Sequence, residues 1–319
     1  MGLKSHNPMQ KKQNTNILPK KIVRITHTDK DDEGSNTWYE AFSYNADGTI
    51  ASIYNSDEEK TYTLEYSPYE IFITNSNIIG TKKFVLKDGR IIRKIFVECH
   101  CDIGVDYDKL EYDEQTIRDI FGDDLGNKFL GYEELTYTYS GDLLSEIKSV
   151  NYDASFTNHY DGQNLTKIEF NCVEGGSIEN EKTVTTFEYN GQPNNLNLNL
   201  LDLFNDEWHF YLDIAGNRNK HLPSHFKVEE EYDLGYILRE ASITYVTDAN
   251  GYITEIKISG KEYRKYDIAY SHTETSPSGD IIYITPIDGE DVEHRNDLLH
   301  KISEETSSFE EIYTITYED

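Results

Sequence analysis

The chain has 319 residues, which is enough for one large β-barrel or for about two domains of average size. Its 59 Asp and Glu outnumber its 30 Lys and Arg, and the net charge of −29 disfavours nucleic acid and anionic membrane surfaces as partners. Aromatic residues make up 13% of the sequence and supply the apolar area that disordered chains lack, so we expect a folded protein.

Residues 1–17 are polar, contain lysines and show no periodicity. They predict a flexible leader ahead of a single β-domain over residues 18–319. No stretch approaches the run of about 20 apolar residues that a membrane helix needs. The N-terminus also lacks the apolar core of a signal peptide, so if the protein is exported we expect its signal to have been removed.

One pattern recurs along the β-domain: an alternating strand rich in Tyr, Phe and Thr, a dipeptide that contains Gly, and a second apolar strand. Its first copy is Phe42–Ile53, with the turn at Gly48. Glycine tolerates the positive φ of tight hairpin turns because it has no Cβ, and the alternation puts rings on one face of a strand and polar groups on the other. Five more glycines repeat the pattern: Gly89, Gly141, Gly162, Gly191 and Gly251.

An isolated hairpin is marginally stable in water, so successive hairpins are expected to pair edge to edge. We therefore predict an all-β fold, a large antiparallel meander of hairpins that is strongly curved or closed. Two segments break the period of two, Asp113–Phe121 and the run around Leu200, Leu203 and Phe204, and they predict one or two short helices.

Three cysteines are too few for a disulfide framework in a chain of this length. Cys99 and Cys101 lack the second ligand pair of a structural zinc site, so we expect small buried or half-buried side chains and no cofactor. Asp29, Asp31 and Glu33, with Gly34 and Glu40, nearly match a calcium loop. That loop joins two helices, whereas strands flank this one. An acidic hairpin tip is the favoured interpretation, and the four acids are candidate metal ligands if a site exists.

The ten histidines are dispersed, and the sequence contains no nucleophile elbow or phosphate-binding glycine loop. We therefore predict no catalytic residues. Three aromatic residues, Trp38, Trp208 and Tyr211, are candidates for a surface on which a sugar or peptide could stack. The alternative is that these rings fill the β core.

The turns at residues 45–50, 160–162 and 248–253 are similar to the Tyr-Asp repeats of Rhs-type proteins. Together with Asn219-Lys220-His221-Leu222-Pro223 before a late hairpin, residues 18–319 resemble an uncharacterised Bacteroidetes family described as a domain of unknown function with a porin-like fold. The resemblance implies a barrel-like antiparallel sheet in an exported protein, often a lipoprotein, in the periplasm or attached to the outer membrane. The lipid-attachment Cys of such precursors is absent from this sequence, so any lipid anchor would lie outside it.

The family brings no established catalytic residues. Membrane barrels present apolar bands to lipid, whereas the polar faces here carry many charges, so we expect a porin-like but water-soluble barrel. The leading hypothesis is a non-enzymatic, exported or surface-exposed binding module for a glycan, peptide or protein partner. The alternatives are a hydrolase that uses acidic residues in the barrel mouth and a structural spacer.

Overall fold

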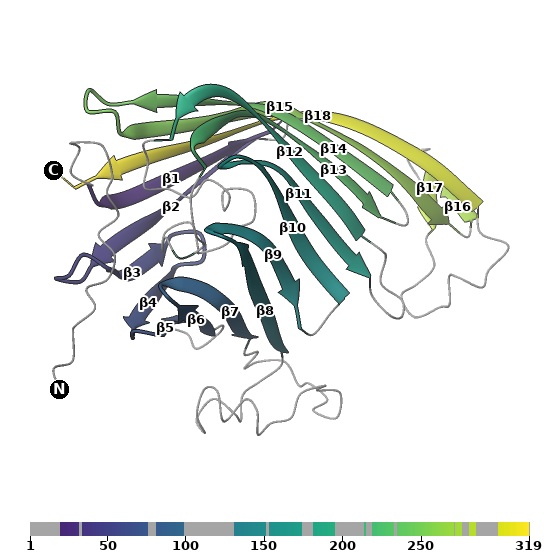
Figure 1. Cartoon of the computed structure of the whole chain (residues 1–319). Helices are drawn as coiled ribbons and strands as arrows, with labels where there is room; N and C mark the ends of the chain where they lie inside the picture. The colour runs from purple at the N-terminus through teal and green to yellow at the C-terminus, as the bar shows by residue number, and fades with distance from the viewer. Residues whose placement is uncertain are drawn as a thin grey trace, which may run out of the picture.

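The computed structural model describes residues 20–31, 34–75, 81–98, 131–150, 153–173, 181–194, 214, 219–232, 235–270, 272–275, 281–284 and 299–318. Within these ranges, sixteen strands pair antiparallel with their neighbours and close into one barrel, which Figure 1 shows from the side. A separate pair of strands, β16 (His272–Thr275) and β17 (Ile281–Ile284), follows β15 along the chain.

The barrel strands follow the order of the sequence around the wall, and β1 closes the circle by pairing with both β2 and β18. They are β1 (Ile22–Lys30), β2 (Ser35–Tyr44), β3 (Ile50–Asn55), β4 (Lys60–Tyr66), β5 (Glu70–Asn75), β6 (Thr81–Lys87), β7 (Arg90–Glu98), β8 (Gly131–Ser140), β9 (Leu143–Ser149), β10 (Asp153–Asp161), β11 (Asn164–Val173), β12 (Glu181–Pro193), β13 (His221–Tyr232), β14 (Gly235–Thr247), β15 (Ile253–Tyr270) and β18 (Leu299–Tyr317).

The glycines of the repeated pattern all have positive φ, as predicted. Five of them lie in direct connections between consecutive antiparallel strands, and Asp88 shares the positive φ of Gly89 in a two-residue turn. The turns at Gly48 and Gly251 are longer than the expected two residues. In the first, Asn45 N–H donates to the Thr49 carbonyl at 2.8 Å, and the second repeats this geometry.

The prediction of a hairpin tip at Gly191 is wrong. β12 continues to Pro193, and β13 begins at His221. Between them the chain reaches distant strands of the wall, because Ile91 N–H donates to the Ile214 carbonyl at 2.9 Å. Ile214 is buried there in the core.

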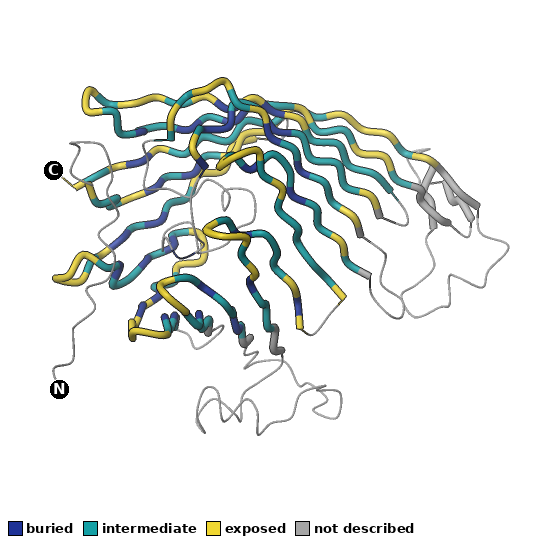
Figure 2. Tube along the Cα trace, in the orientation of Figure 1, coloured by how far each residue is buried: buried dark blue, intermediate teal, exposed yellow. Residues whose placement is uncertain are grey.

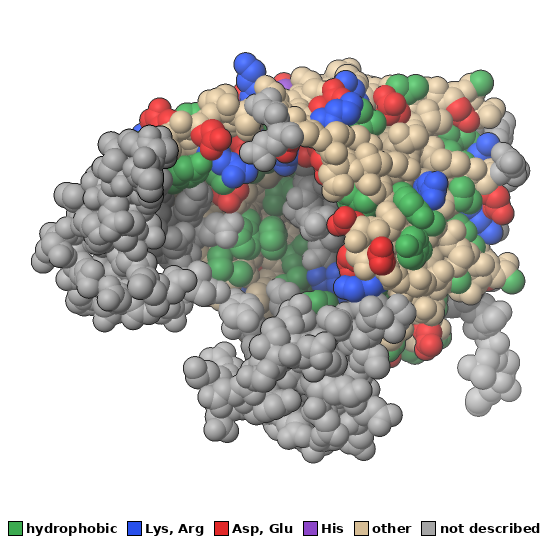
Figure 3. Space-filling view, turned by 180° about the vertical axis from the view of Figure 1, so that it is seen from behind, with side chains coloured by type: hydrophobic (Ala, Val, Ile, Leu, Met, Phe, Trp, Pro, Cys, Tyr) green, Lys and Arg blue, Asp and Glu red, His purple; other side chains and the backbone are tan. Residues whose placement is uncertain are grey.

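The two faces of the wall differ in chemistry. One face carries a cluster of buried apolar side chains from strands around the wall, and this is the inside of the barrel. Figure 2 shows the buried residues, in dark blue, recurring along these strands. From behind, Figure 3 shows a hollow walled by hydrophobic side chains with charged groups at its margin. The other face alternates with it and carries mainly Thr, Ser, Lys and Glu. Period-two alternation therefore separates an apolar interior from a polar exterior.

The wall is uneven in height. β3 and β5 have 6 residues each, whereas β15 has 18 and β18 has 19. In Figure 1 the long green and yellow strands accordingly extend well past the short purple and blue ones. The tight turns and both ends of the barrel sequence, Ile22 and Tyr317, lie at one rim, because Ile22 pairs directly with Tyr317.

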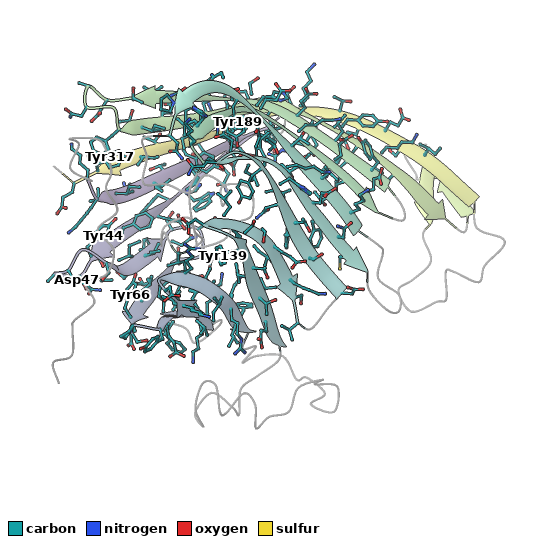
Figure 4. The ribbon with its side chains drawn as sticks, viewed as in Figure 1. Tyr44, Asp47, Tyr66, Tyr139, Tyr189 and Tyr317 are labelled. Carbon is teal, nitrogen blue, oxygen red and sulfur yellow. The ribbon has the colours of Figure 1, made fainter. Side chains whose placement is uncertain are left out.

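Near this rim six tyrosines tie neighbouring hairpins together. Each hydroxyl donates to a main-chain carbonyl of the adjacent strand at 2.5–2.9 Å. Figure 4 labels four of them, on strands spread around the wall. This tyrosine belt consists of Tyr44 to Ile22, Tyr139 to Ile91, Tyr160 to Leu144, Tyr189 to Leu165, Tyr245 to Pro223 and Tyr317 to Ile253.

The described ranges contain no helix, so the predicted short helices are not confirmed; both segments, Asp113–Phe121 and the run around Leu200, lie outside these ranges. The same holds for the expected leader, residues 1–17. Among the described residues there is no helix long and apolar enough to cross a bilayer.

Candidate functional site

Polar side chains interrupt the apolar inner wall on four strands, β2, β1, β18 and β14, and β15 lies between the last two. The cross-strand register places them on the inward face, in line with buried residues such as Ile25 and Ile315. We call this group the inner polar patch; it consists of His27, Asp29, Trp38, Glu40, Arg239, Phe309, Glu311 and Tyr313.

His27 forms the buried end of the patch. Its ring stacks on Trp38, the cross-strand neighbour, with 3.7 Å between ring centroids and 6° between planes. Tyr313 meets the same imidazole edge-on at 4.8 Å. Such offset and edge contacts hold the imidazole in one orientation.

His27 Nε2 has no hydrogen-bond partner, although the atom is buried. The nearest carboxylate oxygen, Glu40 Oε2, lies at 3.6 Å, which is too long for a hydrogen bond and short enough for charge attraction if the imidazole is protonated. Arg239 Nε is buried without a partner in the same way. An unsatisfied buried polar atom costs about 1–3 kcal/mol. Arg239 Nε–H can be satisfied only by a hydrogen-bond acceptor, whereas His27 Nε2 takes a donor or an acceptor according to its tautomer.

Arg239 joins β14 to the Glu311 side of the patch. Its guanidinium lies 4.0 Å from the Phe309 ring centroid and pairs with Glu311. β15 lies between the strands of these partners, so the arginine side chain has to cross it. It does so beside Gly260, which pairs with Ala241 on one side and with Phe309 on the other. The small residues Gly260 and Ala241 leave room for the arginine on the inner wall.

Asp29 and Glu311 form the open end. They are direct cross-strand partners with their carboxylates on the same face. Partial desolvation, and then the charge of Glu311, raise the pKa of Asp29. Burial and Glu311 likewise raise the pKa of the Tyr313 hydroxyl, which donates to Glu311 Oε2 at 3.1 Å. Like charges opposite each other on a sheet are destabilising, so this pair favours a bound cation.

The patch therefore offers excess negative charge rather than free ring faces. Three carboxylates, from Asp29, Glu40 and Glu311, face one guanidinium and one imidazole. The Trp38 indole already stacks on His27, and Arg239 lies over the Phe309 ring. The wall is consequently better suited to an ammonium or guanidinium group than to flat sugar rings.

The sequence-based candidates fall in different places. Trp38 lies in the patch, whereas Trp208 and Tyr211 lie outside the described ranges, so a shared aromatic surface stays a prediction. Of the candidate metal ligands, Asp29 and Glu40 lie on the inner wall. They do not stand opposite each other, because Asp29 pairs with Asn36 and Glu40 pairs with Ile25. Asp31 is exposed in the connection, where it accepts a hydrogen bond from Gly34 N–H at 2.8 Å, and Glu33 lies outside the description.

No group of three or more His, Cys, Asp or Glu side chains that could hold a metal ion occurs among the described residues. The connection from β1 to β2 is a hairpin flanked by strands, as the acidic-tip interpretation expected. Cys172 is half-buried, as expected, and the other two cysteines lie outside the described residues.

Sequence reasoning missed His27, Arg239 and Glu311. The available signal was parity. In β1, His27 and Asp29 share the alternation of the buried Ile25, and in β18 Glu311 shares that of Ile315. A polar residue at a position on the same face as the buried residues of its strand needs a partner or a function. This pattern can be read from the sequence of one strand without knowing that the sheet closes into a barrel.

The closed wall of sixteen antiparallel strands places the chain in the class of porin-like barrels. No protein-family model and no curated protein matches its sequence. Among solved structures it is similar to a porin-like protein from Bacteroides vulgatus, with a TM-score of 0.52 and 14% identity over 94% of this chain and 99% of that one.

A porin-like protein from Bacteroides uniformis is similar to the same extent, with a TM-score of 0.51 and 15% identity over 93% of this chain and 99% of that one. These structures support the porin-like fold that the sequence resemblance implied. No comparison supports the resemblance to Tyr-Asp repeats.

Proposed function

We propose that the protein is a non-enzymatic binding barrel whose outer wall faces water and whose inner polar patch holds a cationic group of its partner. The observation that carries the proposal is the cross-strand pair of inward-facing carboxylates, Asp29 and Glu311, with Glu40 on the same inner wall. The porin-like likeness is compatible with an exported protein, in the periplasm or attached to the outer membrane.

The outer wall supports contact with water because ion pairs cross it on many strands. Glu310 on β18 accepts both Lys30 from β1, at 2.8 Å, and Lys257 from β15. Other pairs lie on strands around the barrel: Lys83 with Glu70, Arg93 with Glu134, Lys167 with Glu169, and Lys265 with Glu304. Each lysine or arginine at a lipid-facing midplane costs about 2–4 kcal/mol, so this surface is poorly suited to hydrocarbon.

We expect the folded chain to stay in the aqueous phase when it is partitioned with a non-ionic detergent that separates on warming. A charged outer wall gains no free energy by entering detergent micelles. Because the apolar side chains face the barrel interior, the described wall exposes no apolar band to the detergent. Recovery of the folded, lipid-free chain mainly in the detergent phase would exclude a water-facing wall.

The proposed ligand class is peptide rather than glycan, because the ring faces of the patch are occupied and its carboxylates are in excess. A lysine or arginine side chain can place its cation between Asp29 and Glu311 and lay its methylenes along the apolar wall. A charge-assisted hydrogen bond there is worth roughly 1.5–3 kcal/mol.

The test compares two neighbouring glutamates on opposite faces of β18. We expect Glu311→Gln to weaken binding of a short arginine-containing peptide about tenfold, because it removes inward charge, and Glu310→Gln to change the affinity less than about twofold. Binding is followed by the fluorescence of Trp38 in a Trp208→Phe background, since these are the chain's two tryptophans.

Neutral oligosaccharides serve as the comparison ligands, and thermal unfolding establishes that both variants are folded. Equal losses in the two variants, or oligosaccharide binding that quenches Trp38 more strongly than the peptide does, would contradict a cation site at the patch.

A further inference from the structure

β18 continues past the end of its neighbour. The last residue of β1, Lys30, pairs with Glu310, whereas β18 extends back to Leu299. β15 covers the other side of this extension, up to the pair of Tyr270 and Leu299. No described strand pairs with β18 on its β1 side between Leu299 and Phe309, and in Figure 1 the yellow strand extends beyond the purple ones there.

Among the described strands, this extension, Leu299–Phe309, is therefore an edge strand in a barrel that is otherwise closed. Alternate N–H and C=O groups of an edge strand point into the lane beside it, which here holds no described strand, and can pair with another extended chain. The lane continues the line of β1, so a strand in it would lie directly beyond Asp29 and next to the inner polar patch.

The side chains along this edge are unequal on its two faces. Glu305 has the parity of Phe309 and Glu311, so it lies on the inward side, where Tyr266 donates its hydroxyl to it at 2.9 Å. The outward side carries Glu304 and Ile302, and Ile302 is 61% exposed. A strand in the lane would thus meet the Glu305 carboxylate, whose cross-strand partner on β15 is Arg264, on its inward side, and Glu304 and Ile302 on its outward side.

We propose that an extended, basic segment of another polypeptide adds to this edge as a further strand, with Lys or Arg facing inward toward Glu305 and Asp29. The inference rests on the proposed function, because the same carboxylates serve the patch. Main-chain hydrogen bonds supply the pairing, and alternate cationic side chains supply the choice of partner.

A second copy of the chain fits the lane less well. In a symmetric antiparallel pair centred on Glu304 or Glu305, that residue would meet its own copy, and like charges opposite each other destabilise a sheet. The net charge of −29 adds repulsion between copies. Charged edges of this kind deter self-association while leaving an oppositely charged strand acceptable.

The probe is a fluorescent peptide of about ten residues in which Lys alternates with Val, a length that matches a typical strand. We expect saturable binding to the full chain, weakened by salt, and protection of the amides of residues 299–309 in hydrogen exchange. The same peptide N-methylated at alternate positions cannot complete the ladder and should neither bind as tightly nor protect these amides.

Two charge reversals localise the contact. Glu305→Lys should weaken the peptide at least about tenfold, whereas Glu65→Lys, an equal charge change on the exposed side of β4, should alter it less than about twofold. Equal effects of the two reversals would reduce the interaction to net charge and overturn the proposal. So would tight binding of the N-methylated peptide.

Deletion of residues 1–19, which contain Lys4, Lys11 and Lys12 and no acidic residue, tests the chain's own leader as the occupant. If the deletion removes amide protection from residues 299–309 in the free protein, the leader occupies the lane and the partner proposal is wrong. If the peptide protects only β1 and β2 near the patch, the cation site stands and the edge proposal falls. If the peptide binds neither at the patch nor at residues 299–309, both the cation-site proposal and the edge-strand proposal are wrong.

Discussion

Replacing Gly260 by alanine is expected to destabilise the barrel by about 3 kcal/mol or more, although the substitution adds a single methyl group. A Cβ at this position would lie 2.2 Å from the Glu240 carbonyl oxygen and 2.6 Å from Ala241 Cβ. Both obstacles belong to β14, so relief requires the two paired strands to separate. The loss would appear as a fall in Tm of roughly 5–10 °C in thermal unfolding followed by circular dichroism.

Gly34→Ala is the matched control. A Cβ there meets nothing within 4 Å, and the residue does not have a positive φ, so the change should stay within about 0.5 kcal/mol. Equal behaviour of the two variants would show that β14 and β15 adjust freely. It would also show that the close packing of β14 against Gly260, over which the Arg239 side chain passes, does not depend on the missing Cβ.

The hairpin repeat could be predicted because its causes are local. A turn such as Asp88-Gly89 requires positive φ at both positions, and Asp and Gly tolerate that conformation. The alternation around Phe42 and Ile53 likewise depends on neighbours within one hairpin. These features are encoded in short windows of sequence, which is why the class of fold and most turns were predicted correctly.

Closure could not be predicted from such windows. It depends on the pairing of Ile22 with Tyr317, residues from opposite ends of the barrel sequence, and no local pattern selects that partner. The failure at Gly191 has a similar cause. The local residues favour a turn, and a positive φ is present, but the chain then continues to a contact between Ile214 and Ile91 that only the closed wall brings together.

The candidate site was predicted in part. Trp38, Asp29 and Glu40 were chosen for residue type, and all three lie on the inner wall. Their neighbours Arg239 and Glu311 come from strands far along the sequence, and their juxtaposition depends on the register across β15. A site assembled from four strands of a closed sheet depends on the topology, and residue type alone does not specify that topology.

The tyrosine belt predicts an alkaline transition as the second large effect. Burial raises the pKa of Tyr44 to about 12, and burial also raises the pKa of Tyr139, Tyr189, Tyr245 and Tyr317. A raised pKa means that the folded state favours the neutral phenol. The resulting stability is complete below the unfolded value of about 10 and is lost as the pH rises through the folded values.

We therefore expect Tm to fall steeply from about pH 10 upward, and tyrosinate absorbance to rise together with the loss of β structure. The double variant Tyr139→Phe, Tyr189→Phe should lose about 1–3 kcal/mol at neutral pH, because two carbonyls lose their donors, and should show a smaller alkaline fall. Tyr69→Phe is the control, since this side chain is 71% exposed and the change should be within about 0.5 kcal/mol. If tyrosinate formed well below the unfolding transition without loss of structure, the hydroxyl contacts between neighbouring hairpins would not contribute to the closure of the wall.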